Sequence, residues 1–105
     1  MNIPKKVKIG GSEYVVEWVN RPCESNSCVQ GEISYTDTKI RIKNDEGFSQ
    51  DYKDYIFIHE VLHGLMFHAG LDQDDETVIR TLSFAIHAFI KDNPEIFNAK
   101  PQPRN

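Results

Sequence analysis

The sequence predicts an α+β fold, with a small antiparallel sheet of about four strands followed by two helices. Apolar and polar residues alternate in short segments up to residue 43, as they do in strands. From residue 50 onward, apolar residues recur with the 3.6-residue period of helices. The length of 105 residues suits one domain. We expect that domain to span residues 1–97, with a frayed tail at 98–105.

Two hairpins account for the expected strands. In residues 5–19, apolar residues alternate on both sides of Gly10–Gly11, a pair that is typical of a tight two-residue turn. In residues 32–43, isoleucine and tyrosine side chains fall on one face of a second hairpin that turns at Asp37–Thr38. The segment between them, residues 20–31, is rich in turn-forming residues and predicts a long loop.

The longest periodic segment predicts a helix over residues 50–69. Ser49 can cap the first turn through its hydroxyl group, and Gly70 stands where a left-handed residue commonly ends a helix. One side of this helix carries apolar residues that we expect to pack on the sheet, namely Tyr55, Ile58, Val61, Leu62 and Leu65.

A second helix is expected to begin after a short turn and to end near residue 92. Asp72 or Asp74 can cap its start, and Pro94 prevents its continuation. Pro94 can in turn begin a last short turn through Phe97. Because the connection between the two helices is short, we expect the second to fold back antiparallel on the first.

Composition excludes several classes of function. The 12 basic and 16 acidic residues give a net charge of -4, which disfavours nucleic-acid binding through a basic face. No apolar run approaches the roughly 20 residues that span a bilayer, and the first residues lack the apolar stretch of a secretory signal. We therefore expect a cytoplasmic protein without membrane contact. Cys23 and Cys28 lie in the polar loop, and a reducing cytosol would keep them as thiols.

Residues 59–63 read His-Glu-Val-Leu-His, the H-E-x-x-H pattern. A helix turns about 100° per residue, so His59 and His63 lie about 40° apart and one turn along the axis. Both imidazoles can therefore bind one Zn²⁺. Glu60, about 100° from His59, is poorly placed as a ligand but well placed to take a proton from a water molecule at the metal. The apolar residues occupy another face, so the histidine pair should face a cleft.

A catalytic zinc site normally has three protein ligands and one open position. Glu76 is the preferred third ligand, because the short turn brings the start of the second helix back to the histidine pair. Asp75 is an alternative at the same place. His68 is another, although in a continuous helix it faces away from the pair. Cys28 would give a site with two histidines and one cysteine.

The second helix carries a polar stripe within about 60° of arc, formed by Glu76, Arg80, Ser83 and His87. Arg80 could pair with a carboxylate of a substrate or support a metal ligand. His87 has the same possible roles, but it lies about 16 Å along the axis from Glu76 and cannot share its metal. A solvated helix face explains both residues equally well.

The chain resembles the small H-E-x-x-H zinc-peptidase-like proteins that are common in bacteriophages and prophages. The resemblance lies in the segments His59–Gly70, Asp75–Glu76 and Lys91–Glu95, in the Lys-rich first strand, and in the Gly-Glu-Ile-x-Tyr and Ile-x-Ile segments of the second hairpin. It is similar to the ImmA/IrrE and SprT-like groups of minimal zincins, in which an antiparallel sheet packs on the active-site helix. The resemblance implies Zn²⁺ at His59 and His63, Glu60 as general base, and an acidic third ligand, which corresponds to Glu76.

These features predict a zinc metallopeptidase, a hydrolase that acts on a peptide or protein substrate. An exposed sheet edge, for which residues 39–43 are the candidate, could hold the substrate as an added strand. The alternative is a non-catalytic zinc-binding regulatory or phage-structural module, because a chain this short leaves little material for substrate subsites beyond one cleft.

Overall fold

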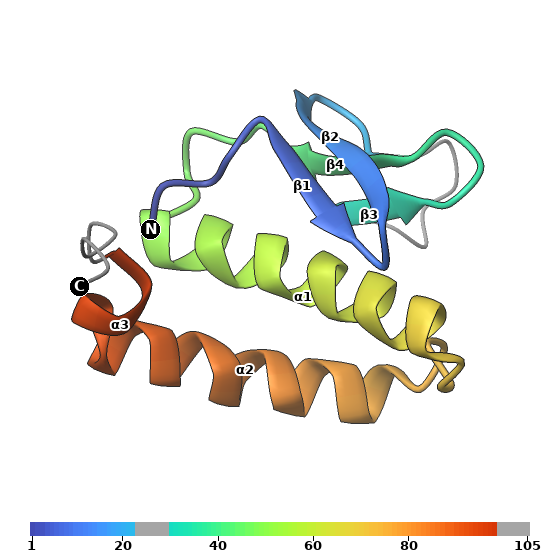
Figure 1. Ribbon diagram of the computed structural model, residues 1–105. Helices are drawn as coiled ribbons and strands as arrows, with labels where there is room; N and C mark the ends of the chain where they lie inside the picture. The colour runs from blue at the N-terminus through green and yellow to red at the C-terminus, as the bar shows by residue number, and fades with distance from the viewer. Residues whose placement is uncertain (23–29, 99–105) are drawn as a thin grey trace, which may run out of the picture.

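The computed structural model describes residues 1–22 and 30–98, which form a sheet, a central helix and an outer helix in three layers (Figure 1). The predicted tail beyond Asn98 and the two cysteines lie outside the described residues. The elements in chain order are β1 (Lys6–Ile9), β2 (Ser12–Val19), β3 (Gly31–Ser34), β4 (Lys39–Lys43), α1 (Gln50–Ala69), α2 (Glu76–Asp92) and α3 (Pro94–Asn98). The predicted α+β class is confirmed.

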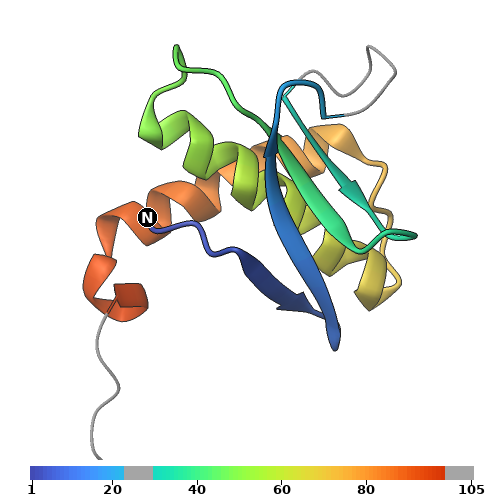
Figure 2. The same ribbon diagram turned by 90° about the horizontal axis from the view of Figure 1, so that it is seen from above.

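The two predicted hairpins form, but the sheet is mixed rather than purely antiparallel. β1 and β2 pair antiparallel around Gly10 and Gly11, whose φ angles of +58° and +83° suit the tight turn between Ile9 and Ser12. β3 and β4 are also antiparallel, whereas β2 and β4 pair in parallel. The strand order is β1-β2-β4-β3, as Figure 2 shows from above.

The position of β4 overturns a second prediction, that residues 39–43 form an exposed edge. β4 lies between β2 and β3, so the edge on this side of the sheet is β3. The physical reason is burial. β4 carries Ile40 and Ile42, both with no exposed surface, and a strand with two inward isoleucines is more stable in the interior of the sheet.

The predicted bounds of α1 are confirmed. Each end of the helix has a local capping interaction. The Ser49 hydroxyl group accepts a hydrogen bond from the backbone N–H of Tyr52 at 3.1 Å. At the other end Gly70 has a φ of +77°, and Leu71 N–H donates to the Met66 carbonyl at 2.8 Å.

The core lies between the sheet and α1, and α1 buries a wider surface than predicted. Ile56 and Phe57 join the cluster beneath the sheet, whose other buried members are Ile9, Tyr14, Val16, Ile40 and Ile42. Ile58 and Leu62 are buried outside that cluster, on the side of α1 that faces α2. Leu65 is 49% exposed, which contradicts its predicted place on the sheet. The prediction failed because helical periodicity does not show which side of α1 the sheet covers; the sheet packs on the side that carries Ile56 and Phe57.

Close approach of α1 to the sheet depends on Gly64. A β-carbon built there would lie only 2.9 Å from Cδ1 of Ile33 and 3.1 Å from Cδ1 of Ile9. Glycine at this point of the helix therefore allows β1 and β3 to pack directly on the turn that carries His63.

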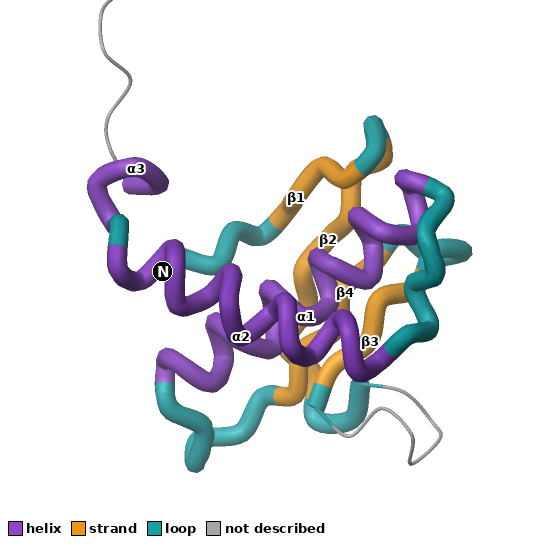
Figure 3. Tube along the Cα trace, turned by 90° about the horizontal axis from the view of Figure 1, so that it is seen from below, coloured by secondary structure: helices purple, strands orange, loops and turns teal. Residues whose placement is uncertain are grey.

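α2 runs antiparallel to α1 on the side opposite the sheet, as Figure 3 shows from below. Its cap is Asp75, whose side chain accepts from Val78 N–H at 3.2 Å, and not Asp72 or Asp74 as predicted. The Asp72 carboxylate instead accepts from Asp74 N–H at 3.0 Å and holds the turn before the helix. Among the described residues, none of the helices is both long and apolar enough to span a bilayer.

Candidate metal centre

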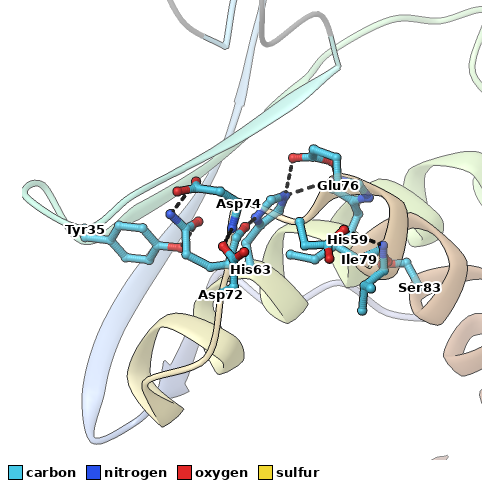
Figure 4. Close-up of polar contacts among 11 residues, drawn as sticks. Tyr35, His59, His63, Asp72, Asp74, Glu76, Ile79 and Ser83 are labelled. Atoms are coloured by element: carbon cyan, nitrogen blue, oxygen red, sulfur yellow. Dashed lines mark hydrogen bonds and ion pairs between the residues drawn. The ribbon is translucent and has the colours of Figure 1, made fainter.

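Three predicted ligands converge where the first turn of α2 meets the middle of α1 (Figure 4). Nε2 of His63 lies 3.3 Å from Nε2 of His59. The Oε1 atom of Glu76 lies 2.9 Å from Nε2 of His63, and its Oε2 atom lies 3.3 Å from Nε2 of His59. The helical repeat sets the first distance, and the turn at residues 70–75 brings the carboxylate to the pair.

These distances suit a tetrahedral metal ion. With ligand bonds of about 2.0–2.1 Å, a tetrahedron around Zn²⁺ has edges of about 3.3–3.4 Å. The three contacts, at 2.9 to 3.3 Å, are close to those edges. Two imidazoles and one glutamate are also a ligand set of catalytic zinc sites, which keep a fourth position for water. The residues present therefore fit zinc.

The hydrogen bond of His63 supports the same conclusion. Its Nδ1 lies 2.6 Å from the carbonyl oxygen of Gln73, so Nδ1–H donates to that oxygen. In the neutral ring, Nε2 then directs a lone pair toward the Glu76 carboxylate at 2.9 Å. A lone pair and a carboxylate repel at this distance unless a proton or a metal cation lies between them. A carbonyl behind the ring is also the usual support of a metal-binding histidine.

His59 has no comparable support. Its Nδ1 atom is buried and has no hydrogen-bond partner among the residues that the structure describes. Burial, followed by the neighbouring His63, lowers the pKa of His59, and both effects favour the neutral imidazole that can bind a metal. Tyr55, four residues earlier on α1, packs its ring against His59 with 5.8 Å between ring centroids.

Glu60 points toward β3 rather than toward the three ligands. It is 6% exposed, and a β-carbon added to Gly31 would lie 3.2 Å from its Oε2 atom. In the metal-free protein, burial raises the pKa of Glu60 to about 8, and the charges of Glu76 and Glu32 add to the shift. A carboxyl group with a pKa in this range can both accept and release a proton near neutral pH.

A cavity of about 600 Å³ adjoins these groups, between α1, the start of α2 and the edge strand β3. The histidine pair lines it, as predicted, and so do Glu60 and Glu76. Most other lining residues were not predicted from the sequence, and they are Gln30, Gly31, Glu32, Ile33, Tyr52, Tyr55, Ile56 and Gln73. Helical spacing alone could have indicated Tyr55, because it lies four residues before His59 on the same side of α1.

Of the alternative ligands, the two that the structure describes, His68 and Asp75, do not join this group. His68 lies on the sheet side of α1, where its Nε2 is 2.7 Å from the hydroxyl oxygen of Tyr14. It thus faces away from the histidine pair, as expected for a continuous helix. Asp75 uses its carboxylate to cap α2. Cys28 lies outside the described residues.

The polar stripe of α2 divides between different surroundings. Arg80 lines the cavity, whereas Ser83 is buried and donates to the Ile79 carbonyl at 2.6 Å. His87 lies away from the cavity, in a second group of titratable side chains with Asp51 and Asp54.

This second group has cations of its own. Asp54 lies 2.8 Å from the amino group of Met1, and Asp51 lies 2.6 Å from Nζ of Lys91. Both carboxylates already pair with a positive charge. They are therefore less available as metal ligands than the side chains at the His59 site. This group was not predicted from the sequence, since Asp51 and His87 lie far apart along the chain.

Comparison of the chain with protein-family models, with curated proteins and with solved structures found no match.

Proposed function

We propose that this protein is a zinc-dependent peptidase in which His59, His63 and Glu76 hold the metal and Glu60 is the general base. The observation that carries the proposal is the convergence of the three ligand atoms at 2.9 to 3.3 Å beside a cavity that Glu60 also lines. A zincin-type arrangement, with the sheet packed on the H-E-x-x-H helix, belongs to the same proposal. So does a cytoplasmic site of action.

The chemistry divides between the ion and the protein. Zinc, when bound, supplies a Lewis acid that polarises the scissile carbonyl and acidifies water. Glu60 takes the proton from the attacking water and transfers it to the nitrogen of the leaving amine as the peptide bond breaks. Burial against Gly31 favours this role, because the carboxylate is poorly solvated and a base of raised pKa holds the proton between the two steps.

The edge strand β3 supports a peptide as the substrate. Within the described chain β3 pairs only with β4, and Gly31 and Ile33 of this strand line the cavity. An extended peptide can add to such an edge through main-chain hydrogen bonds, and antiparallel pairing is the commoner arrangement. This strand takes the role that the sequence analysis gave to residues 39–43.

A non-catalytic zinc module is the second candidate. Apolar side chains on α2 support it, since Val78, Leu82 and Phe89 are 40% to 54% exposed on a helix that the other described elements cover on one side. Such a face suits a protein that holds zinc for its fold and binds a partner.

One experiment distinguishes the candidates. Purified wild type and Glu60→Gln are compared for zinc content and for cleavage of a peptide library, with Glu13→Gln on β2 as the matched exposed control. The peptidase proposal expects equal zinc in all three proteins and a loss of cleavage of about a hundredfold or more in Glu60→Gln alone. Equal cleavage by wild type and Glu60→Gln contradicts the mechanism. One bound zinc ion with no cleavage by any of the proteins favours the non-catalytic module.

A further inference from the structure

Arg80 is the only lysine or arginine among the described residues that line the cavity. It stands one helical turn after Glu76 on α2, so the two side chains leave the helix about 40° apart. Phe84, one turn further along, stacks on Tyr55 with 4.3 Å between ring centroids. Arg80 therefore lies along α2 between the candidate metal ligand Glu76 and Phe84, whose ring stacks on Tyr55 of the cavity lining.

The carboxylates near Arg80 are engaged elsewhere. Glu76 is directed at the two histidines, Glu32 lies 3.4 Å from Arg41, and Glu60 is buried beside Gly31. No acidic group within the described residues lies within 4.0 Å of the Arg80 guanidinium. A guanidinium has five N–H donors in a planar fork that matches a carboxylate. An exposed arginine in this position can bind a carboxylate that enters the cavity.

The direction of β3 shows which end of a peptide would meet Arg80. Gly31, at the start of β3, lies against Ile56 and Glu60. Tyr35, just after the end of β3, donates a hydrogen bond from its hydroxyl group to the side-chain oxygen of Gln73 at 3.1 Å. A peptide that pairs antiparallel with β3 therefore has its N-terminal residues near Gln73 and its C-terminal residues toward Tyr55 and Arg80. Arg80 thus lies on the side of the segment that leaves as the amine.

We propose that Arg80 is a specificity-determining residue that binds a carboxylate of the peptide on the C-terminal side of the scissile bond. The carboxylate is either the C-terminal group of the peptide or an aspartate or glutamate side chain. This inference rests on the proposed peptidase function and adds the substrate class to it.

The test measures binding separately from catalysis. Zinc-loaded Glu60→Gln, with and without Arg80→Gln, is titrated with fluorescein-labelled hexapeptide libraries. One pair of libraries differs only in a free or amidated C-terminus. A second pair, both amidated, carries glutamate or glutamine at the fifth position. Lys8→Gln on β1 is the control for the change in net charge, and Arg80→Lys keeps the charge without the planar fork.

Arg80→Gln is expected to weaken binding by about tenfold to a hundredfold for the carboxylate form of one pair and to leave its neutral form unchanged. The pair that responds identifies the source of the carboxylate. Arg80→Lys should recover part of the affinity, and Lys8→Gln should bind as its parent. In the protein that retains Glu60, Arg80→Gln should raise KM for the same peptides and leave kcat nearly unchanged.

Two results overturn the role of Arg80. One is an equal loss for carboxylate and neutral peptides, which would indicate a general electrostatic or structural effect. The other is no loss for either form, with cleavage retained. Failure of the proposed function gives a different pattern, in which wild type cleaves nothing or Glu60→Gln cleaves as well as wild type. That pattern removes the basis of the Arg80 assignment as well.

Discussion

The two long helices lie side by side, yet they are buried to very different extents (Figure 1). α1 contacts the sheet on one side and α2 on the other, and it buries eight residues, including Glu60 and His63. α2 contacts α1 and α3 but no strand of the described sheet, and it buries only Ile79 and Ser83. Burial is therefore set by the layer in which a helix lies rather than by how regularly its apolar residues recur.

The candidate metal centre draws on both helices. The buried helix supplies the two histidines and Glu60, whereas the outer helix supplies Glu76, whose side chain is 60% exposed. Substitutions on α1 should therefore change stability and chemistry together. Substitution of the exposed carboxylate on α2 should change metal binding with little effect on the metal-free fold.

The largest expected effect compares one phenylalanine on each helix. Phe57 on α1 is 8% exposed, whereas Phe89 on α2 is 54% exposed. Phe57→Ala should lower the free energy of unfolding by about 3 to 5 kcal/mol, because it removes a buried ring and leaves a cavity. Phe89→Ala should cost about 1 kcal/mol or less. Urea denaturation followed by circular dichroism measures both, and similar losses would show that α2 is covered by something besides α1.

The next prediction concerns the buried carboxyl group of α1. In the metal-free protein, burial raises the pKa of Glu60 from its ordinary value of 4.5 to about 8. Between these values the folded protein holds a proton that the unfolded chain has lost, so stability falls as pH rises from about 5 to about 8. Glu60→Gln removes this dependence. The variant should match wild type below about pH 4.5 and exceed it by on the order of 5 kcal/mol above pH 8.

Thermal denaturation of both metal-free proteins across this pH range measures the difference. The histidines are common to both proteins, so their titration largely cancels in the comparison. A constant difference across this pH range would mean that the pKa of Glu60 in the folded metal-free protein is close to its ordinary value.

Zinc should stabilise the protein through the exposed ligand on α2. At a zinc concentration about 100-fold above Kd, binding raises the free energy of unfolding by about 2.7 kcal/mol. If Glu76→Gln weakens affinity about a hundredfold, the same zinc concentration contributes only about 0.4 kcal/mol. Calorimetric melting with zinc and with EDTA tests this expectation. An equal response of wild type and Glu76→Gln to zinc would exclude Glu76 as a ligand.

The smallest effect is expected where the C-terminal end of α2 meets the N-terminal end of α1. Lys91 at the end of α2 lies 2.6 Å from Asp51 at the start of α1, and both side chains are well exposed. The hydrogen bond from Lys91 lowers the pKa of Asp51. Lys91→Gln should raise the pKa of Asp51 toward its ordinary value, as measured by an NMR titration, with no resolvable change in unfolding temperature. A clear drop in that temperature would show that the ion pair helps to hold α2 against α1.

Local signals explain which parts of the fold could be predicted. Ser49 and Gly70 act on their own turns of backbone, so the bounds of α1 followed from the sequence. The start of α2 did not, because Asp72, Asp74 and Asp75 are all suitable caps. In the structure α2 begins after Asp75, and the preceding turn makes a contact distant in sequence, in which the Gln73 carbonyl accepts from His63.

Sheet order and helix faces also depended on distant contacts. Alternation in residues 39–43 indicated a strand but could not show that Ile40 and Ile42 would lie between two neighbours. The apolar side of α1 was correctly identified at Ile58 and Leu62, yet the sheet packs on another side, through Ile56 and Phe57. Periodicity shows that a face is apolar and does not show which element covers it.

The sequence by itself determined the local geometry of this protein. The helical repeat places His59 and His63 on one side of α1 with Glu60 beside them, and the two-residue glycine turn determines the first hairpin. Only the tertiary structure decided that the Glu76 carboxylate meets the histidines, that β3 rather than β4 is an edge strand and that Gly31 lies against Glu60. Backbone torsions and hydrogen bonds act over one turn, whereas these contacts join segments that come together only when the layers pack.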